Sequence, residues 1–343
     1  MNKVLLIGLT PPLEGGSERH IYEISSRMKN STVLTQKGSS CKRKIEVYTL
    51  NNSSFLRSIS FFFSCLFYAI FLTFSKKQYS TIHVHENLLY FLIPLLSLRY
   101  KTVVTVHGIK GFKFYDVKFL WFFFRQALKS ANQLIAVNKE DEKLLKHFFK
   151  KVSYIPNGVD HSAYENLHTA VKKKISFIGR IHEQKGLVYL LESFQTINKD
   201  FPDFSLEIIG EINDYAKELK KKFQNKNIIW RGYLSDRNEI IKSLSSAYCI
   251  CLPSLWEGLP LTLFEALAAG RPVILSDIPA FKSVIKDEAI FFKCKETRDL
   301  TDKIESLLKN KKKGDEIGKK GEKLAMEYSW NKIAKRTENE YKI

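Results

Sequence analysis

The sequence is poor in cysteine and has no framework for disulfides. Its 343 residues include five cysteines, which are scattered and form no C-x-x-C pair. Small secreted domains that depend on disulfides carry cysteines at regular spacing, so this usage favours a reducing, cytosolic compartment. The first residues run directly into a short apolar strand, without the apolar core and cleavage site of a signal peptide. Both features favour a cytoplasmic protein.

Two common cofactor signatures are also missing. The first strand is followed by Gly8-Leu-Thr-Pro-Pro-Leu-Glu-Gly15, which does not supply the G-x-G-x-x-G turn of a nicotinamide-binding domain. His83 and His85 lie two apart on one predicted strand, but no third ligand at suitable spacing accompanies them. We therefore expect no metal site and no bound cofactor.

Charge of one sign dominates the chain. Lysine and arginine number 55 against 36 aspartates and glutamates, a formal net charge of +19. The lysine runs at 172–174, 220–222 and 311–313 lack the interleaved aromatic residues on which single-stranded nucleic acid stacks, so we expect no nucleic acid. Anionic lipid headgroups attract such surfaces by roughly 1 kcal/mol per nearby basic side chain. A lysine-rich surface that is merely solvated is the alternative.

Length and hydrophobic patterning predict two domains. A chain of 343 residues exceeds one ordinary core, and 44% hydrophobic with 27% charged residues describes a globular protein. Short apolar strands alternate with helix-like runs in two successive series, which is typical of α/β domains with parallel sheets. We expect domains at residues 1–165 and 166–327, and a C-terminal helix within 328–343 that returns to the first domain. The expected strands are Val4–Gly8, Ser31–Thr35, Ile45–Thr49, Thr81–His85, Thr102–Val106 and Gln133–Val137, then Lys174–Ile178, Ser205–Ile209, Ile228–Trp230, Ala247–Leu252 and Pro272–Ser276.

Two aromatic-rich runs, Ile59–Phe74 and Phe119–Arg125, lie in the first series, and Arg57 and Lys76 flank the longer one. The sixteen residues of the longer run would span about 24 Å as a helix, short of the ~30 Å hydrocarbon core. A spanning segment would also sever the predicted sheet. The longer run is therefore either a buried crossover helix or a helix lying at a membrane interface. Together with the basic charge, the two runs favour peripheral contact with an anionic membrane.

The most informative segment carries two acids, Glu257 and Glu265, which are separated by seven residues. Pro260 suits the first turn of a helix, and Gly270 followed by Pro272 suits its end. Glu257 then lies in the loop before the helix, and Glu265 lies about one turn inside it. The first turn of a helix presents unpaired N–H groups and a positive dipole end, which favour phosphate. One acid on each side of a bound diphosphate suggests a sugar nucleotide.

This segment resembles the E-x7-E signature of the retaining glycosyltransferases of family 4, which have the two-domain GT-B fold. The resemblance implies two Rossmann-like domains that face each other across a cleft, the first for the acceptor and the second for the nucleotide sugar. After Ser276-Asp277 the chain departs from the pattern, because Ile278–Ile285 replaces a glycine-rich stretch. Other landmarks occur in the family's order over nearly the whole chain: Val4-Leu-Leu-Ile-Gly8 with Gly15-Gly-Ser-Glu-Arg-His20, Thr105-Val-His-Gly108, Ile155-Pro-Asn-Gly-Val-Asp160 and Ile178-Gly-Arg-Ile-His-Glu-Gln-Lys-Gly186.

The resemblance also implies roles for individual residues. Arg180 and Lys185 would neutralise the departing diphosphate at the carboxyl end of a strand; solvated surface cations are the alternative. Glu257 would hold hydroxyls of the donor sugar, Glu265 those of the ribose, and His107 would contact the donor sugar and shape the reacting centre. The expected catalytic set is His107, Arg180, Lys185 and Glu257. The expected donor-binding set is Gly15, Gly16, Arg180, Lys185, Tyr233, Glu257, Gly258, Leu261, Thr262, Leu263 and Glu265.

The D-x-D metal motif of the other glycosyltransferase fold is absent, and the resemblance implies a reaction without metal. Retention would follow from departure and attack on one face of the sugar, with a diphosphate oxygen as base. We expect a nucleotide-sugar donor and a glycan or lipid-linked acceptor, in bacterial surface polysaccharide or lipopolysaccharide synthesis at the inner face of the cytoplasmic membrane. One alternative is a Rossmann-type nicotinamide-dependent oxidoreductase. The other, a non-enzymatic basic membrane-associated protein, leaves the paired acids and cations unexplained.

Overall fold

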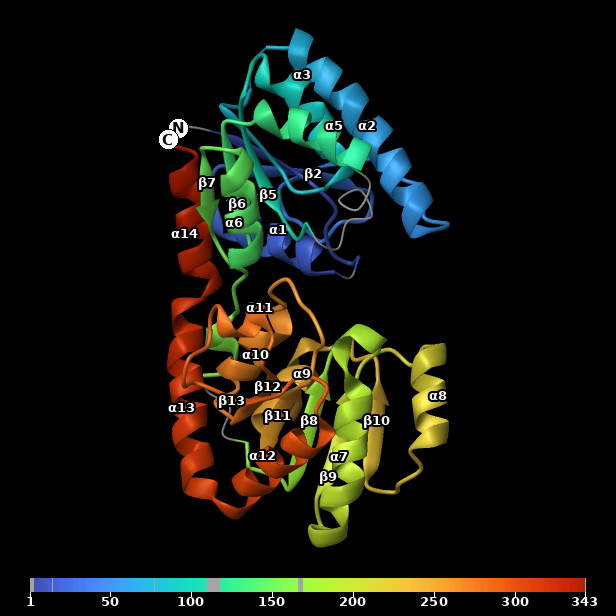
Figure 1. Cartoon of the computed structure of the whole chain (residues 1–343). Helices are drawn as coiled ribbons and strands as arrows, with labels where there is room; N and C mark the ends of the chain where they lie inside the picture. Colours follow the sequence, from blue (N-terminus) through green and yellow to red (C-terminus); the bar gives the residue numbers. More distant parts are fainter. Residues whose placement is uncertain (1–2, 14, 77, 110–117, 166–168, 343) are drawn as a thin grey trace. The chain divides into compact units, whose positions relative to one another are not determined.

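The computed structural model describes residues 3–13, 15–76, 78–109, 118–165 and 169–342. The chain forms two compact units (Figure 1). Unit 1 comprises Met1–Asn157 together with Trp330–Ile343, and unit 2 comprises Gly158–Ser329. The units divide at Asn157, earlier than the expected boundary after residue 165, so the whole polar stretch that follows Asn157 belongs to unit 2.

Unit 1 is built on a parallel sheet of seven strands in the order β3-β2-β1-β4-β5-β6-β7. The strands are β1 Val4–Ile7, β2 Ser31–Gln36, β3 Lys44–Val47, β4 Thr81–Val84, β5 Lys101–Val106, β6 Gln133–Ala136 and β7 Val152–Tyr154. Every residue of β1 is buried, as expected for a central strand covered on both faces. Ile7 lies opposite Leu34 of β2 and Val84 of β4, so the strand order reverses around β1. Ligands of open α/β sheets bind beyond the carboxyl ends of strands at such a reversal.

The helices of unit 1 include one from the C-terminus. Helix α14 packs along α1, and Arg27 Nε of α1 donates to Asn331 Oδ1 of α14 at 3.0 Å (Figure 1). The last eleven residues of regular structure thus complete unit 1. The helices are α1 Gly16–Arg27, α2 Ser54–Phe74, η1 Leu88–Leu92, α3 Ile93–Ser97, α5 Lys118–Lys129, α6 Lys139–Phe148 and α14 Trp330–Glu340.

Helix α2 is longer than the sequence indicates. It begins at Ser54, where the Ser53 side chain accepts a hydrogen bond from the Leu56 N–H, and it runs for 21 residues. Its length is therefore about 31 Å, so the expectation that it is too short to cross a bilayer is wrong. One stripe of the helix packs into the core of unit 1: Phe61, Cys65, Ala69 and Leu72. Because α2 also connects two strands of one sheet, it is a crossover helix whose opposite face stays exposed.

Unit 2 is a second parallel sheet, with six strands in the order β10-β9-β8-β11-β12-β13. The strands are β8 Lys174–Ile178, β9 Ser205–Ile209, β10 Ile228–Gly232, β11 Cys249–Leu252, β12 Val273–Ser276 and β13 Ile290–Phe292. The helices are η2 His161–Ala163, η3 Glu183–Lys185, α7 Leu187–Asp200, α8 Asp214–Lys222, α9 Arg237–Ser245, α10 Leu261–Ala268, α11 Pro279–Lys282, α12 Thr297–Lys309 and α13 Lys311–Glu327. The two expected series of strands are present. The short edge strands β7 and β13, of three residues each, were not expected.

Helix α13 comes close to α10 because it carries glycine at three buried positions, Gly314, Gly318 and Gly321. A β-carbon at Gly318 would lie 2.5 Å from the Gly270 carbonyl oxygen, and one at Gly321 would lie 2.9 Å from a methyl carbon of Leu267. Gly270 adopts a left-handed conformation just after α10, with φ of 66°. The glycine face of α13 therefore holds the end of α10, the helix that carries Glu265.

The substitution Gly318→Ala tests this packing. Alanine would normally stabilise a helix interior by about 1 kcal/mol. Here its methyl group meets backbone, so we expect a loss of about 1–3 kcal/mol in the free energy of unfolding. Urea unfolding measures the change, and Lys319→Ala, at an exposed neighbouring position, is the control. A Gly318→Ala protein as stable as the wild type would contradict the close approach.

Candidate active site

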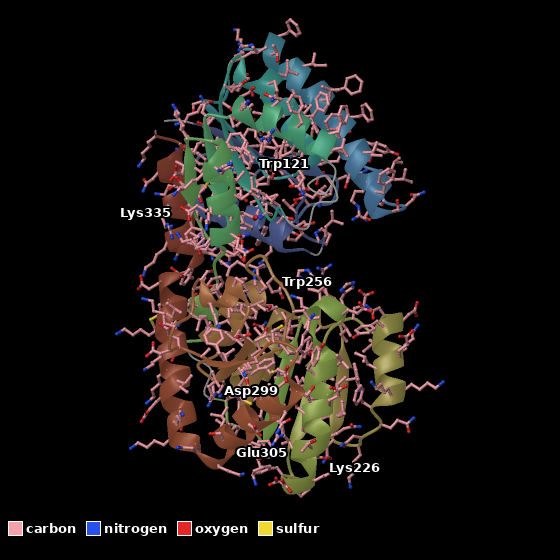
Figure 2. The ribbon with its side chains drawn as sticks, in the orientation of Figure 1. Trp121, Lys226, Trp256, Asp299, Glu305 and Lys335 are labelled. Atoms are coloured by element: carbon pink, nitrogen blue, oxygen red, sulfur yellow. The ribbon has the colours of Figure 1, made fainter. Side chains whose placement is uncertain are left out.

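Two loops of unit 2 are held together at the carboxyl ends of neighbouring strands. One follows β8 and contains η3; the other follows β11 and leads into α10. Since β8 and β11 pair in parallel, both loops leave the same edge of the sheet. The Leu255 N–H donates to the Gln184 carbonyl at 2.7 Å, and Gln184 Nε2 donates to the Trp256 carbonyl at 2.9 Å. Figure 2 shows Trp256 at this edge, and Lys226 at the opposite end of the unit. The two motifs singled out in the sequence thus lie side by side.

Gly186 makes this contact possible. It adopts a left-handed conformation with φ of 61°, and a β-carbon there would lie 2.0 Å from the Pro253 carbonyl oxygen. A side chain would therefore clash with backbone of the neighbouring loop, and it would also strain the turn. Glycine at this position lets η3 end against the second loop and fixes the place of Lys185.

Lys185 and Glu257 form an ion pair between the two loops. Lys185 Nζ lies 2.6 Å from Glu257 Oε1, and the two side chains are only 12% and 7% exposed. The Ser254 hydroxyl donates to the same carboxylate oxygen at 2.7 Å. An ammonium has three donors, so Lys185 keeps hydrogen-bonding capacity for an additional anion while Glu257 holds it in place. Arg180, on the same loop after β8, is exposed.

Helix α10 forms close to where the sequence places it. It begins at Leu261, directly after Pro260, so Pro260 precedes the first helical residue and does not occupy the first turn. Gly258 lies exposed in the loop, and Leu261 and Thr262 are half-buried in the first turn. The sequence also suggests the Leu263 N–H as a donor to the nucleotide sugar. In the structure this N–H already donates to the Pro260 carbonyl at 3.2 Å. The N–H groups of Leu261 and Thr262 remain the candidates for an anion.

Glu265 lies one turn inside α10 and has a partner that the sequence does not indicate. Arg237 Nη1, at the first residue of α9, donates to Glu265 Oε1 at 2.8 Å. Burial raises the pKa of the nearby Tyr164 hydroxyl, and the Glu265 charge adds to the effect. Tyr233 is exposed just after β10, whose last residue Gly232 has φ of 73°. Arg237 and Tyr164 therefore join Glu265 in one polar cluster, and nothing in the local sequence signals this.

In unit 1, the glycine pair and His107 lie at the corresponding edge of the first sheet. Gly15 precedes α1 in extended conformation, and Gly16 is the first helical residue. Space around Gly16 is open: among the described residues outside its own helix, no atom lies within 4 Å of the place of a β-carbon, so packing against them does not demand glycine there. His107 follows β5 directly and is half-buried. These residues lie where the expected strand and helix boundaries place them.

His107 belongs to a cluster of four histidines. His85 Nδ1 lies 3.2 Å from His107 Nε2, and the His20 ring meets the His107 ring edge-on with centroids 5.0 Å apart. His83 bonds to the hydroxyls of Tyr341 and Thr105, at 2.7 and 2.8 Å.

The cluster holds its imidazoles neutral at pH 7. Burial lowers the pKa of each, and that of His20 falls to about 4. Within the described ranges, no group of three or more His, Cys, Asp or Glu side chains is placed to hold a metal ion.

The histidine cluster predicts that unit 1 loses stability in mild acid. An unfolded histidine protonates near 6.5 and folded His20 near 4, so the unfolded state binds more protons between these values. Stability therefore falls as the pH falls through this window, by about 2 kcal/mol for His20 between pH 7.5 and 5. Burial raises the pKa of Glu86 to about 7, which acts in the opposite direction.

Comparison of the wild type with His20→Gln isolates the contribution of His20 to the pH dependence of stability, because the contribution of Glu86 is common to both proteins. Hydrogen exchange of β4 and β5 at the two pH values reports the stability of unit 1. The variant should lose about 2 kcal/mol less than the wild type on acidification. Equal losses in both proteins would show that His20 does not carry the effect.

Family comparisons agree with the geometry of both units. Residues 164–324 match the family described as glycosyl transferases group 1, and residues 14–163 match the one described as glycosyltransferase family 4. Over 243 residues the chain is 28% identical to UDP-Gal:alpha-D-GlcNAc-diphosphoundecaprenol alpha-1,3-galactosyltransferase of Escherichia coli, covering 62% of each protein. Over 248 residues it is 26% identical to N,N'-diacetylbacillosaminyl-diphospho-undecaprenol alpha-1,3-N-acetylgalactosaminyltransferase of Campylobacter jejuni, covering 66% of this chain and 65% of that relative. The matches thus span less than two thirds of each relative.

Solved structures match over almost the whole chain. Sucrose-phosphate synthase from Thermosynechococcus elongatus superposes with a TM-score of 0.78 at 17% identity, covering 100% of this chain and 98% of that one. Anabaena HepE in complex with UDP gives a TM-score of 0.80 at 14% identity, covering 98% of both chains. At such identities the likeness concerns the fold. It confirms the expected fold class of two Rossmann-like units with parallel sheets, as in GT-B proteins.

Proposed function

Because the chain belongs to the group 1, family 4 glycosyltransferases, we propose that it moves a sugar from a nucleotide-sugar donor to a lipid-linked or membrane-proximal glycan. The observation that carries the proposal is the juxtaposition of Lys185 with Glu257 and of Glu265 with the start of α10. The bacterial relatives in the comparison act on diphosphoundecaprenol-linked sugars, which supports a lipid-linked acceptor in surface polysaccharide or lipopolysaccharide synthesis. Neither the nicotinamide-dependent oxidoreductase nor the non-enzymatic alternative finds support in these matches.

In the proposed reaction, unit 2 binds the donor. Arg180 and Lys185 lie beside the diphosphate, where their charges stabilise the negative charge that develops as the sugar leaves. The N–H groups of Leu261 and Thr262 face the phosphate at the helix start, which also favours an anion. Glu257 accepts hydrogen bonds from hydroxyls of the donor sugar. The basic side chains and the helix terminus thus supply the electrostatic stabilisation, and the proposed reaction is metal-independent.

The remaining roles complete a retaining transfer. Glu265 accepts hydrogen bonds from the ribose, Tyr233 and Gly258 lie against the donor, and Gly15-Gly16 approaches its phosphate from unit 1. His107 contacts the donor sugar as a neutral imidazole, since burial lowers its pKa well below the ordinary value. The acceptor hydroxyl attacks the face from which the diphosphate leaves, and a diphosphate oxygen takes its proton. The configuration at the transferred carbon is then retained.

The Lys185–Glu257 pair gives a test that separates catalysis from folding. Lys185→Gln leaves a nearly buried carboxylate without its partner, so the variant should lose both activity and stability. The double variant Lys185→Gln/Glu257→Gln removes both charges and should regain stability. Its donor hydrolysis should stay at least about 100-fold below wild type, because the diphosphate has lost Lys185, one of its two proposed cations.

Donor hydrolysis and urea unfolding are measured for each variant, with a panel of UDP-, GDP- and ADP-sugars as donors. Lys226→Gln, at the far end of unit 2, is the control and should match the wild type (Figure 2). Recovery of activity together with stability in the double variant would leave Lys185 with a structural role only.

We also propose peripheral contact between unit 1 and the cytoplasmic face of an anionic membrane. The exposed face of α2 is aromatic: Phe63, Phe67, Ile70, Phe71 and Phe74 are between 41% and 86% exposed. Helix α5 adds exposed Phe119, Phe122 and Phe123, and both helices pack on η1. Arg57 and Lys76 lie at the two ends of α2. Such a surface combines apolar area with basic charge, as interfacial helices do.

Vesicle flotation tests this contact. Phe67→Asp/Phe71→Asp should move the protein from the floating to the soluble fraction with vesicles of phosphatidylglycerol and phosphatidylcholine, because each buried aromatic contributes about 1.5–3 kcal/mol. Met326→Asp places a single aspartate on an exposed apolar position of unit 2 and should still float. Wild-type protein that stays in the soluble fraction at physiological salt would refute the contact.

A further inference from the structure

The carboxylate of Glu265 is held by one arginine from a different helix. Arg237 Nη1 donates to Glu265 Oε1 at 2.8 Å, and the two side chains are 30% and 14% exposed. Arg237 begins α9, after β10, whereas Glu265 lies in α10, after β11. Among the residues that the structure describes, no other side chain donates to Glu265. The pair therefore determines where this carboxylate points, and it leaves Oε2 for another donor.

A second feature of the same cluster points to a bound group. Tyr164 is 7% exposed, and its hydroxyl is buried without a hydrogen-bond partner in the described part of the chain. Tyr164 belongs to the same buried cluster as Leu263 and Phe264 of α10, the helix that carries Glu265, and the charges of Glu265 and Arg237 act on the pKa of its hydroxyl. A buried hydroxyl without a partner is unfavourable, and native structures rarely keep one unless a water or ligand completes it.

We propose that Arg237 is a positioning residue, which holds Glu265 so that the site selects a ribonucleotide over a 2′-deoxyribonucleotide. This inference rests on the proposed function, in which Glu265 accepts from the ribose. A glutamate on a helix surface samples several rotamers, and the arginine restricts it to the one that presents Oε2. The planar guanidinium also keeps its charge at any physiological pH and fixes direction better than an ammonium.

The physical consequence is a difference in affinity between a ribonucleotide and its 2′-deoxy counterpart. A site that is built to bond a hydroxyl rejects an analogue without it, because its own polar group is then left unpaired. A hydrogen bond to a carboxylate corresponds to more than about tenfold in affinity. If the Glu265 carboxylate can turn away from the bound nucleotide, it is not left unpaired when the 2′-hydroxyl is missing. The site then no longer rejects the 2′-deoxy analogue. Loss of Arg237 should therefore weaken ribonucleotide binding and leave deoxyribonucleotide binding almost unchanged.

Titration calorimetry on the full chain tests the inference. Wild type is titrated with UDP, GDP and ADP, and the nucleotide that binds is compared with its 2′-deoxy counterpart. We expect wild type to prefer the ribonucleotide by about tenfold or more, and Arg237→Gln to reduce the preference towards that of Glu265→Gln. Arg237→Lys should keep part of it. Lys242→Gln, at an exposed position on the same helix, should keep all of it.

The double variant Arg237→Gln/Glu265→Gln distinguishes positioning from general stabilisation. If Arg237 acts through Glu265, the double variant should show the same preference for the ribonucleotide as Glu265→Gln alone. Arg237→Gln with an unchanged preference, or with equal weakening of both nucleotides, would overturn the inference. So would a wild type that binds both equally. Absence of binding to all three nucleotides would instead refute the proposed function, and the inference with it.

Discussion

The close contact between the loop after β8 and the loop after β11 is the constraint on which the candidate site depends. Gly186 lies so near the Pro253 carbonyl that no side chain fits between them. The Leu255 N–H donates to the Gln184 carbonyl, and the Gln184 side chain donates to the Trp256 carbonyl, which joins the loops. Lys185 and Glu257 are fixed by this contact, since each lies within a few residues of it. The start of α10 follows directly, and its end is held by the glycine face of α13. The backbone contact between Gly186 and Pro253 thus determines the positions of Lys185 and Glu257.

Both acids of the E-x7-E segment are paired with a cation from another element. Glu257 takes Lys185 from the loop after β8, and Glu265 takes Arg237 from α9. Because the carboxylates are largely buried, an unpaired one would be costly, whereas a pair on an exposed surface contributes little. The pairs hold two carboxylates next to a helix start that favours anions. This arrangement suits a ligand that carries both phosphates and hydroxyls.

Unit 1 contrasts with unit 2 in its polar groups and its surface. The imidazoles of its histidine cluster are neutral, because loss of solvent opposes their charge and no carboxylate pairs with them among the described contacts. Its helix α2 packs one stripe into the core and presents aromatic side chains on the other face. The apolar residues of this helix therefore form two surfaces, and its sequence fits both a buried helix and an interfacial helix.

Apolar period, proline and glycine act locally, so the two alternating series, most strands and the approximate limits of α10 follow from the sequence alone. It did not indicate β7 and β13, since three residues carry no measurable period, nor the start of α2, where only a serine cap extends the helix. It identified Lys185, Glu257 and Glu265 as separate groups. The pairing of Lys185 with Glu257 and of Glu265 with Arg237 emerges only in the folded protein, because residues on different loops and helices meet only when the sheet forms.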